Sequence, residues 1–181
     1  VMKNKLRFPT VRAVVVDELF DAVGFKTDKN WEKQLARIAE ADSIHVAVPS
    51  TLQADLRDYQ RQGYAWLKRL AHWNSGACLA DDMGLGKTIQ VLALLIAEKQ
   101  QTPKRNQKPT LLVLPASLLA NWKSEIEKFA PSLKALYVHP SEMPADHLKR
   151  LARRADDEVG EVDVVLTTYG MLLRQTWLLE V

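Results

Sequence analysis

The sequence lacks the features of secreted, membrane-spanning or disulfide-stabilised proteins. Its 181 residues contain one cysteine, Cys78, so an internal disulfide and a cysteine-rich zinc site are excluded. The longest apolar run, Val91 to Ala97, is much shorter than the about 20 residues needed to cross a bilayer. No charged head followed by an apolar stretch opens the sequence, so no secretory signal is predicted. We expect a cytoplasmic protein with no membrane partner.

The sequence also lacks a large excess of positive or negative charge. The chain is 47% hydrophobic and 26% charged, with a formal net charge of +3 at pH 7. These values are typical of a globular protein and exclude disorder, collagen-like repeats and coiled coil as its main character. The length allows one domain with a real core. The small excess of basic residues is weak support for nucleic-acid binding.

From Leu56 onward, the sequence alternates between short apolar segments, typical of strands, and amphipathic segments, typical of helices. Short apolar strands are predicted at 77–80, 110–114, 134–139 and 162–166, and helices at 56–73, 87–100, 118–129 and 144–155. This alternation predicts a parallel sheet with helices on both faces, doubly wound by right-handed crossovers. Ligands bind beyond the carboxyl ends of such strands, so we expect chemistry in the loops after Ala80, Leu114 and Leu166. The first fifty residues differ, with a predicted strand at 12–20 and an amphipathic helix at 31–41.

A glycine-bearing loop, residues 81–88 (DDMGLGKT), stands between a predicted strand and a predicted helix. Glycines let backbone N–H groups approach phosphates, and the following helix directs its positive end at the anion. Lys87 is suited to the β- and γ-phosphates of a nucleoside triphosphate, and the Thr88 hydroxyl to Mg²⁺. Asp81 stands where the strict GxxxxGK(S/T) pattern has glycine. The context favours nucleotide binding over a glycine-rich turn with a surface lysine.

Four segments, in order, resemble the SWI/SNF-related branch of the superfamily-two helicase-like ATPases. The first is LRDYQ (56–60), followed by Gly63 and Trp66-Leu67, and the second is LADDMGLGKTIQ (79–90). LLVLPASLLANWKSEIEKF (111–129) resembles the family's motif Ia, and DVVLTTYGML (163–172) resembles the segment around motif Ib. Asp82 departs mildly from the glutamate of many members. The form ADDMGLGKT looks most like the bacterial members.

This resemblance implies an α/β fold of a defined kind. Residues 51–181 would form part of the first RecA-like lobe, a three-layer P-loop structure with a parallel sheet flanked by helices. The lobe would be incomplete at its C-terminus. Residues 1–50 would be an N-terminal extension or the end of a preceding domain.

The family's functional roles carry over by matched position. Gln60 would hydrogen-bond the adenine of ATP, and Lys87 and Thr88 would be the catalytic residues acting on the phosphates and Mg²⁺. The residues implied for nucleotide binding are Arg57, Gln60, Asp82, Met83, Gly84, Leu85, Gly86, Lys87 and Thr88. The residues implied for the phosphate backbone of double-stranded DNA are Ser117, Asn121, Lys123, Thr167 and Thr168. The residues alone also allow plainer interpretations: a solvated Gln60, a helix-capping Ser117 and a strand-ending Thr167.

The function implied is that of an ATP-driven translocase on double-stranded DNA. Family members hydrolyse ATP with a later DEAH-like acidic motif and an arginine from a second RecA-like lobe, and neither follows Thr168 in this sequence. We therefore expect a chain that binds ATP and Mg²⁺ but hydrolyses little alone. Its parent would remodel DNA-bound complexes at the bacterial nucleoid. Two alternatives stay open: a non-catalytic, nucleotide-responsive interaction module, and an unrelated phosphate-loop kinase or GTPase.

Other patterns have ordinary explanations. Residues 14–18 (VVVDE) imitate an acidic strand end, but they precede the phosphate loop, whereas the family places that element after it. The basic residues at 149–154 are followed at once by acids at 156–158, which predicts a solvated helix face. The four histidines show no metal-ligand spacing; they are His45, His72, His139 and His147.

Overall fold

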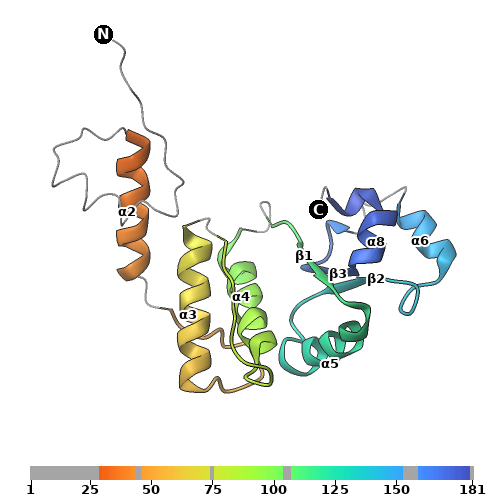
Figure 1. Cartoon of the computed structure of the whole chain (residues 1–181), viewed down its shortest axis with the longest axis horizontal. Coiled ribbons are helices and arrows are strands. Elements are labelled where there is room, and N and C mark those ends of the chain that lie inside the picture. The colour runs from red at the N-terminus through yellow and green to blue at the C-terminus, as the bar shows by residue number, and fades with distance from the viewer. Residues whose placement is uncertain (1–28, 44–45, 74–75, 104–106, 153–158, 180–181) are drawn as a thin grey trace, which may run out of the picture. The chain divides into compact units, whose positions relative to one another are not determined.

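The computed structural model describes residues 29–43, 46–73, 76–103, 107–152 and 159–179. The chain divides into two compact units, residues 1–47 with 65–80 and residues 48–64 with 81–181, and each is described by itself. The elements are α2 (Lys29–Ser43), α3 (Asp58–His72), α4 (Lys87–Gln101), β1 (Thr110–Leu114), η3 (Ala116–Leu118), α5 (Leu119–Phe129), β2 (Ala135–Val138), α6 (Ala145–Leu151), β3 (Val164–Thr168), α8 (Tyr169–Arg174) and η4 (Thr176–Leu179) (Figure 1). None of the described helices is long and apolar enough to span a membrane.

The first unit contains α2 and the C-terminal half of α3. The helix predicted over 31–41 is confirmed as α2, which extends slightly beyond it at both ends. Within this unit, His72 Nε2 lies 3.8 Å from Glu40 Oε2. The strand predicted at 12–20 lies outside the described residues. The predicted boundary near residue 50 stays a prediction.

The second unit is built on a three-stranded parallel sheet in the order β1-β3-β2. All five residues of the central strand β3 are buried, as expected for a parallel strand covered on both faces. The predicted helix over 87–100 is confirmed as α4, and the predicted strand over 110–114 is confirmed as β1. The parallel α/β architecture expected from the alternation is therefore confirmed.

Helices cover both faces of the sheet. Val165 pairs with Leu111 on one side and Leu136 on the other, and all three pack in one apolar core with residues of α6, α8 and η4. Side chains alternate along a strand, so Tyr137 points to the opposite face. There Lys123 of α5 lies over its ring, with Nζ 5.4 Å from the ring centre. Figure 1 accordingly draws α5 below the sheet and α8 above it.

One predicted strand is wrong. Residues 76–80 have no regular secondary structure, and Ala77 and Cys78 are exposed. A short apolar run becomes a strand only when a neighbour pairs with it, and none of the described strands pairs with this one.

α3, α5 and β2 lie within the predicted ranges 56–73, 118–129 and 134–139 and are one to three residues shorter, and two other elements differ more. β3 begins at Val164 and ends at Thr168, two residues later than predicted at both ends, and Asp163 just before it is hydrogen-bonded to the backbone of Lys134. The helix predicted over 144–155 is described as α6 and ends at Leu151, with residues 153–155 outside the described part of the chain.

Candidate nucleotide-binding site

Two glycines shape the loop that leads into α4. Gly84 and Gly86 have φ angles of 85° and 75°, in the left-handed region that side chains disfavour. Gly86 is the residue immediately before the first turn of α4. A Cβ on Gly86 would also lie 2.5 Å from Nε2 of Gln60. The backbone conformation therefore requires glycine at position 86, and any other residue would also displace the Gln60 carboxamide.

Lys87 folds back onto this loop. Its Nζ donates to the backbone carbonyls of Asp81 at 2.6 Å and Asp82 at 2.9 Å. Both acceptors are uncharged, so these bonds leave the positive charge of the ammonium unneutralised. A phosphate would place an opposite charge beside the ammonium, which an uncharged carbonyl cannot do. A phosphate can therefore replace the two carbonyls as partners of Lys87.

The loop fits a nucleoside triphosphate with Mg²⁺. The first N–H groups of the 15-residue helix α4 have no acceptor within the helix, and its dipole favours an anion there. Asp82, Met83, Gly84 and Leu85 are exposed, so a ligand can reach the loop. Thr88 is half-buried in the first turn, and its hydroxyl is an oxygen ligand of the kind that Mg²⁺ prefers. When bound, Mg²⁺ would neutralise part of the phosphate charge.

Gln60 connects the start of α3 to the phosphate loop. Its Oε1 accepts from the backbone N–H of Arg57 at 2.9 Å, which caps the helix. Its Nε2 donates to the carbonyl of Leu85 at 3.1 Å. Gln60 is buried and Arg57 is exposed. The adenine contact predicted for Gln60 stays a prediction; it would use the second hydrogen of Nε2 or the second lone pair of Oε1.

Gln90, for which no role was predicted, also holds the loop. Gln90 donates from Nε2 to Oδ2 of Asp81 at 3.1 Å and to the carbonyl of Gly86 at 3.4 Å. The sequence held one signal for this contact. Gln90 is a polar residue in a stretch of α4 that is otherwise apolar from Ile89 to Ala97.

Two of the residues predicted to contact DNA are exposed. Ser117 lies in η3, after the carboxyl end of β1. Asn121 lies in α5, where its Nδ2 donates to Glu125 Oε1 at 3.0 Å. Both side chains can be reached from solvent, as a phosphate contact requires.

The two threonines predicted to contact DNA are buried. The Thr167 hydroxyl donates to the carbonyl of Val138 at 3.0 Å and joins β3 to β2. The Thr168 hydroxyl caps α8 by accepting from the backbone N–H of Met171 at 3.4 Å. Each hydroxyl therefore has a partner within the fold. The backbone N–H groups at the start of α8 are the nearby alternative donors for a phosphate.

Lys123 is held by an acidic partner. Its Nζ lies 2.5 Å from Oε2 of Glu142, whose hydrogen bond and charge raise the pKa of Lys123. Burial, followed by the charges of Glu127 and Glu142, raises the pKa of the neighbouring Tyr137 to about 12. A DNA phosphate would have to displace Glu142 to gain this lysine.

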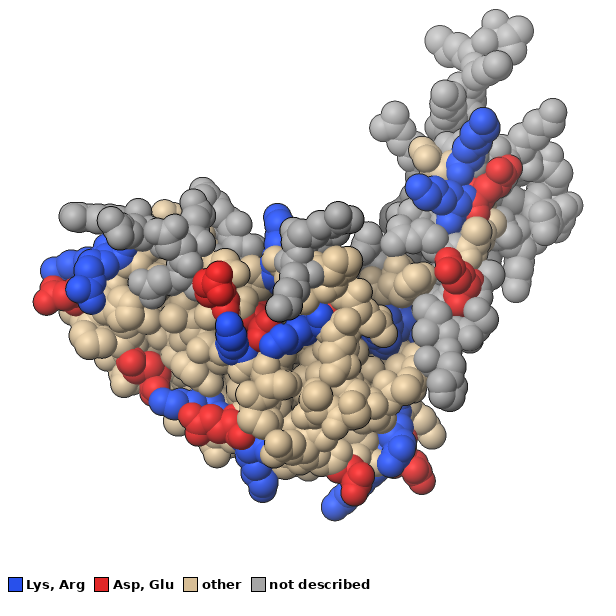
Figure 2. Space-filling view, turned by 180° about the vertical axis from the view of Figure 1, so that it is seen from behind, with Lys and Arg blue, Asp and Glu red and all other residues tan. Residues whose placement is uncertain are grey.

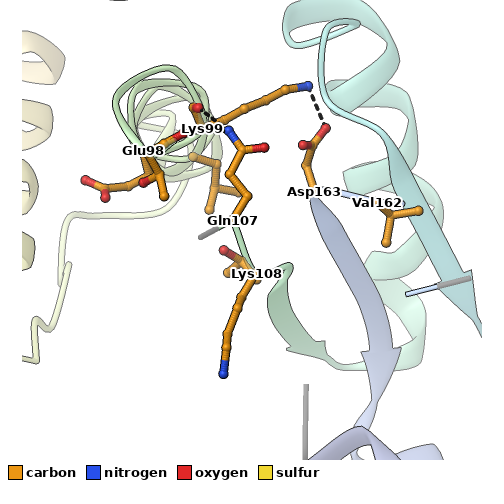
Figure 3. A pocket seen from close by; sticks show the side chains of 9 residues that line it. Glu98, Lys99, Gln107, Lys108, Val162 and Asp163 are labelled. Atoms are coloured by element: carbon orange, nitrogen blue, oxygen red, sulfur yellow. Dashed lines mark hydrogen bonds and ion pairs between the residues drawn. The ribbon is translucent and has the colours of Figure 1, made fainter. Parts of the chain in front are cut away.

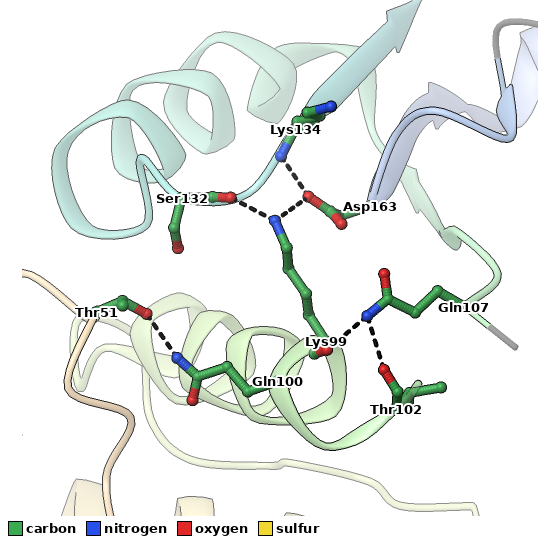
Figure 4. A network of polar contacts seen from close by, with 8 residues as sticks. All are labelled: Thr51, Lys99, Gln100, Thr102, Gln107, Ser132, Lys134 and Asp163. Carbon is green, nitrogen blue, oxygen red and sulfur yellow. Dashed lines mark hydrogen bonds and ion pairs between the residues drawn. The ribbon is translucent and has the colours of Figure 1, made fainter. Parts of the chain in front are cut away.

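The far end of α4 carries a second polar cluster, shown in Figure 4. Lys99 Nζ donates to the carbonyl of Ser132 at 2.6 Å and to Asp163 Oδ2 at 2.7 Å. The same carboxylate oxygen accepts from the backbone N–H of Lys134 at 2.7 Å. The Asp163 side chain is 15% exposed and the Lys99 side chain 30%. This cluster joins α4 to the starts of β2 and β3.

A pocket of about 240 Å³ lies beside this cluster (Figure 3). It is lined by Leu95, Glu98, Lys99, Thr102, Gln107, Lys108, Thr110, Val162 and Asp163. It lies at the amino ends of β1 and β3, the edge opposite to the one where parallel α/β sheets bind ligands. None of the residues predicted for ATP or DNA lines it.

The charge on the face drawn in Figure 2 gives no separate indication of a DNA-binding site. Figure 2 shows basic and acidic side chains interspersed over the described residues of the face that it draws. This distribution agrees with the small net charge of +3.

Comparisons with known proteins agree with the motifs described for this chain. The model of the SNF2-related domain matches residues 59–181. YwqA of Bacillus subtilis (strain 168), provisionally named an ATP-dependent helicase/translocase, is 37% identical over 155 residues, which are 84% of this chain and 16% of YwqA. The transcription regulatory protein SNF2 of Saccharomyces cerevisiae is 39% identical over 124 residues, which are 68% of this chain and 7% of that protein.

Solved structures give the same result. The SWI2/SNF2 ATPase core domain of Sulfolobus solfataricus matches with a TM-score of 0.62 and 36% identity, over 78% of this chain and 26% of that one. The same core in complex with double-stranded DNA matches with a TM-score of 0.59 and 36% identity, over 74% and 25%. The chain thus spans about a sixth of YwqA and about a quarter of the archaeal core. From its motifs, its parallel sheet and these matches, the chain belongs to the SNF2-related family of helicase-like ATPases.

Proposed function

We propose that this chain is the ATP-binding part of a motor that moves along double-stranded DNA and remodels the complexes bound to it. The observation that carries the proposal is the phosphate loop. It is exposed, it is shaped by Gly84 and Gly86, and its Lys87 is bonded to uncharged carbonyls of the same loop. ATP with Mg²⁺ would replace those carbonyls at Lys87 and gain the Thr88 hydroxyl as a metal ligand.

In this proposal the remaining loop residues bind through their backbone. The N–H groups from Asp82 to Gly86 would contact the phosphates, because the glycines leave them open to an anion. Gln60 would contact the adenine with the remaining hydrogen of Nε2 or lone pair of Oε1, and the exposed Arg57 would lie beside the base or ribose.

Double-stranded DNA is proposed as the track. Support comes from the archaeal SWI2/SNF2 core solved with double-stranded DNA, and from the helicase/translocase name of YwqA. Ser117 and Asn121 are exposed and are the side chains we favour for phosphate contacts. Lys123 would also contact a DNA phosphate once it releases Glu142. Thr167 and Thr168 would hold the nearby backbone in place, and the backbone N–H groups would contact the phosphate. Such a motor would work at the nucleoid in a bacterial cytoplasm.

We also propose that groups outside this chain are required for ATP hydrolysis. Phosphoryl transfer needs an oriented water and cationic stabilisation besides the loop and its metal. This chain corresponds to about a quarter of the archaeal ATPase core. ATP would therefore bind here and be hydrolysed in the complete protein.

The experiment uses the full-length protein and a triplex-displacement assay, in which movement along duplex DNA removes a third strand. We expect ATP-dependent displacement together with DNA-stimulated phosphate release. Lys87→Ala should reduce both by about a hundredfold or more, the usual cost of losing one group that stabilises transition-state charge. Unwinding of a forked duplex without triplex displacement would contradict the proposal. Robust DNA-stimulated phosphate release by the 181-residue chain alone would contradict its last part.

A further inference from the structure

Gln90 is a fully buried polar side chain beside the phosphate loop. Its relative exposure is 0%, in the first turn of α4. Apolar residues occupy most of the other buried positions of this helix. A glutamine at such a position loses its contacts with water and needs hydrogen-bond partners in the protein.

The carboxamide of Gln90 joins the two ends of the loop. A glutamine Nε2 has two hydrogens to donate. Here Nε2 contacts Oδ2 of Asp81, the first residue of the loop, and the carbonyl of Gly86, the last residue before α4. The Gln90 side chain therefore bridges the start and the end of the segment that would surround the phosphates, beside the bonds of Lys87 to Asp81 and Asp82.

The oxygen of the same carboxamide is left without a partner. Gln90 Oε1 is buried and has no hydrogen-bond partner among the residues that the structure describes. It lies directly over Gly63 of α3, where any Cβ would overlap it. An unpaired buried oxygen destabilises a fold, and an apolar side chain of the same shape would avoid that cost. Stability alone therefore does not account for a glutamine at this position.

We propose that Gln90 is a positioning residue for the phosphate loop, and that Gly63 is required because it leaves room for it. Gln90 holds Asp81 and Gly86 at the separation at which the loop N–H groups converge on a triphosphate. Gln60, three residues before Gly63 on α3, contacts Leu85 of the same loop. The inference rests on the proposed function, because it concerns the binding of ATP at this loop.

The test compares the affinity of the full-length protein for a fluorescent ATP analogue with its thermal stability. Gln90→Met keeps the shape of the side chain and removes both bonds to the loop. We expect its Kd to rise about five- to tenfold, while its melting temperature stays unchanged or increases. Gln100→Met is the matched control, because Gln100 lies at the other end of α4 and bonds to Thr51 Oγ1. Its Kd should stay within twofold of the wild type.

A second pair of variants tests the bond to Asp81 itself. Gln90→Glu places two acceptors face to face, and adding Asp81→Asn restores a donor and an acceptor in the reverse order. The double variant should bind the analogue at least threefold more tightly than Gln90→Glu alone. Wild-type affinity in Gln90→Met, a loss of its stability together with its affinity, or absence of rescue would each overturn the inference. A wild-type protein that binds no ATP analogue would overturn the proposed function, and this inference with it.

Discussion

The two ends of α4 each carry a lysine bonded to backbone carbonyls, but the two lysines are held differently. Lys87 bonds to Asp81 and Asp82, which are six and five residues away in its own loop. Lys99 bonds to Ser132 and Asp163, which are 33 and 64 residues away. In these bonds the Lys87 ammonium donates only to uncharged carbonyls. The Lys99 ammonium also donates to the Asp163 carboxylate, which accepts a second bond from the Lys134 backbone. One lysine can change partners, and the other joins distant parts of the chain.

This difference separates binding from stability along a single helix. The Lys87 ammonium can leave the carbonyls of its own loop and bind a phosphate without breaking a contact between distant parts of the fold. Releasing Lys99 would leave the Asp163 carboxylate, which is only 15% exposed, without its cationic partner. The amino end of α4 is therefore suited to a ligand, and the carboxyl end to holding β2 and β3 in register.

The largest effect should come from Lys87→Ala, which tests the binding end. Charge-assisted hydrogen bonds contribute about 1.5–3 kcal/mol, so ATP binding should weaken at least about tenfold. The free energy of unfolding should change less than in Lys99→Ala, because the bonds lost lie within one loop and no carboxylate is left without its cationic partner. Equilibrium titration with a fluorescent ATP analogue and urea unfolding measure the two quantities. A large loss of stability would remove the distinction between the two lysines.

Lys99→Ala should have the opposite effect. Losing one partner of this partly buried pair should lower the free energy of unfolding by about 1–3 kcal/mol, measured by urea unfolding of the 181-residue chain. The affinity for the ATP analogue should stay within about twofold.

Lys149→Ala is the matched control for this variant. Lys149 Nζ lies 3.9 Å from Asp146, and both side chains are largely exposed. Its loss should cost less than about 0.5 kcal/mol. Equal effects of the two alanine variants would show that the Lys99 cluster contributes nothing beyond a surface pair.

The two ends also differ in how far the sequence predicted them. The conformation of the loop at 81–88 was predictable because two glycines before a lysine and a threonine indicate a tight turn into a helix, which Gly84 and Gly86 form with positive φ angles. Its binding of phosphates stays a prediction. The Lys99 cluster was not predictable. It depends on Asp163, 64 residues later, and only the folded topology brings the two residues together.

The same reasoning accounts for the strands. β1 and β3 were predicted as strands because continuous apolar runs mark buried parallel strands, and both pair along their full length. Residues 77–80 have a similar composition, yet the described part of the chain gives them no pairing partner. Local composition therefore indicates which segments can become strands, whereas pairing decides which segments do.

Apart from the two control variants, the smallest effect should come from Gln107→Ala, at the carboxyl end of α4. Gln107 Nε2 donates to the carbonyls of Lys99 at 2.7 Å and Thr102 at 2.8 Å, close to where α4 ends. Gln107 is exposed, so water can replace it, and its loss should cost about 0.5 kcal/mol in urea unfolding. The exposed Gln53→Ala is the matched control and should cost less. A Gln107→Ala effect as large as that of Lys99→Ala would show that the carbonyls ending α4, rather than the ion pair, hold this end of the helix.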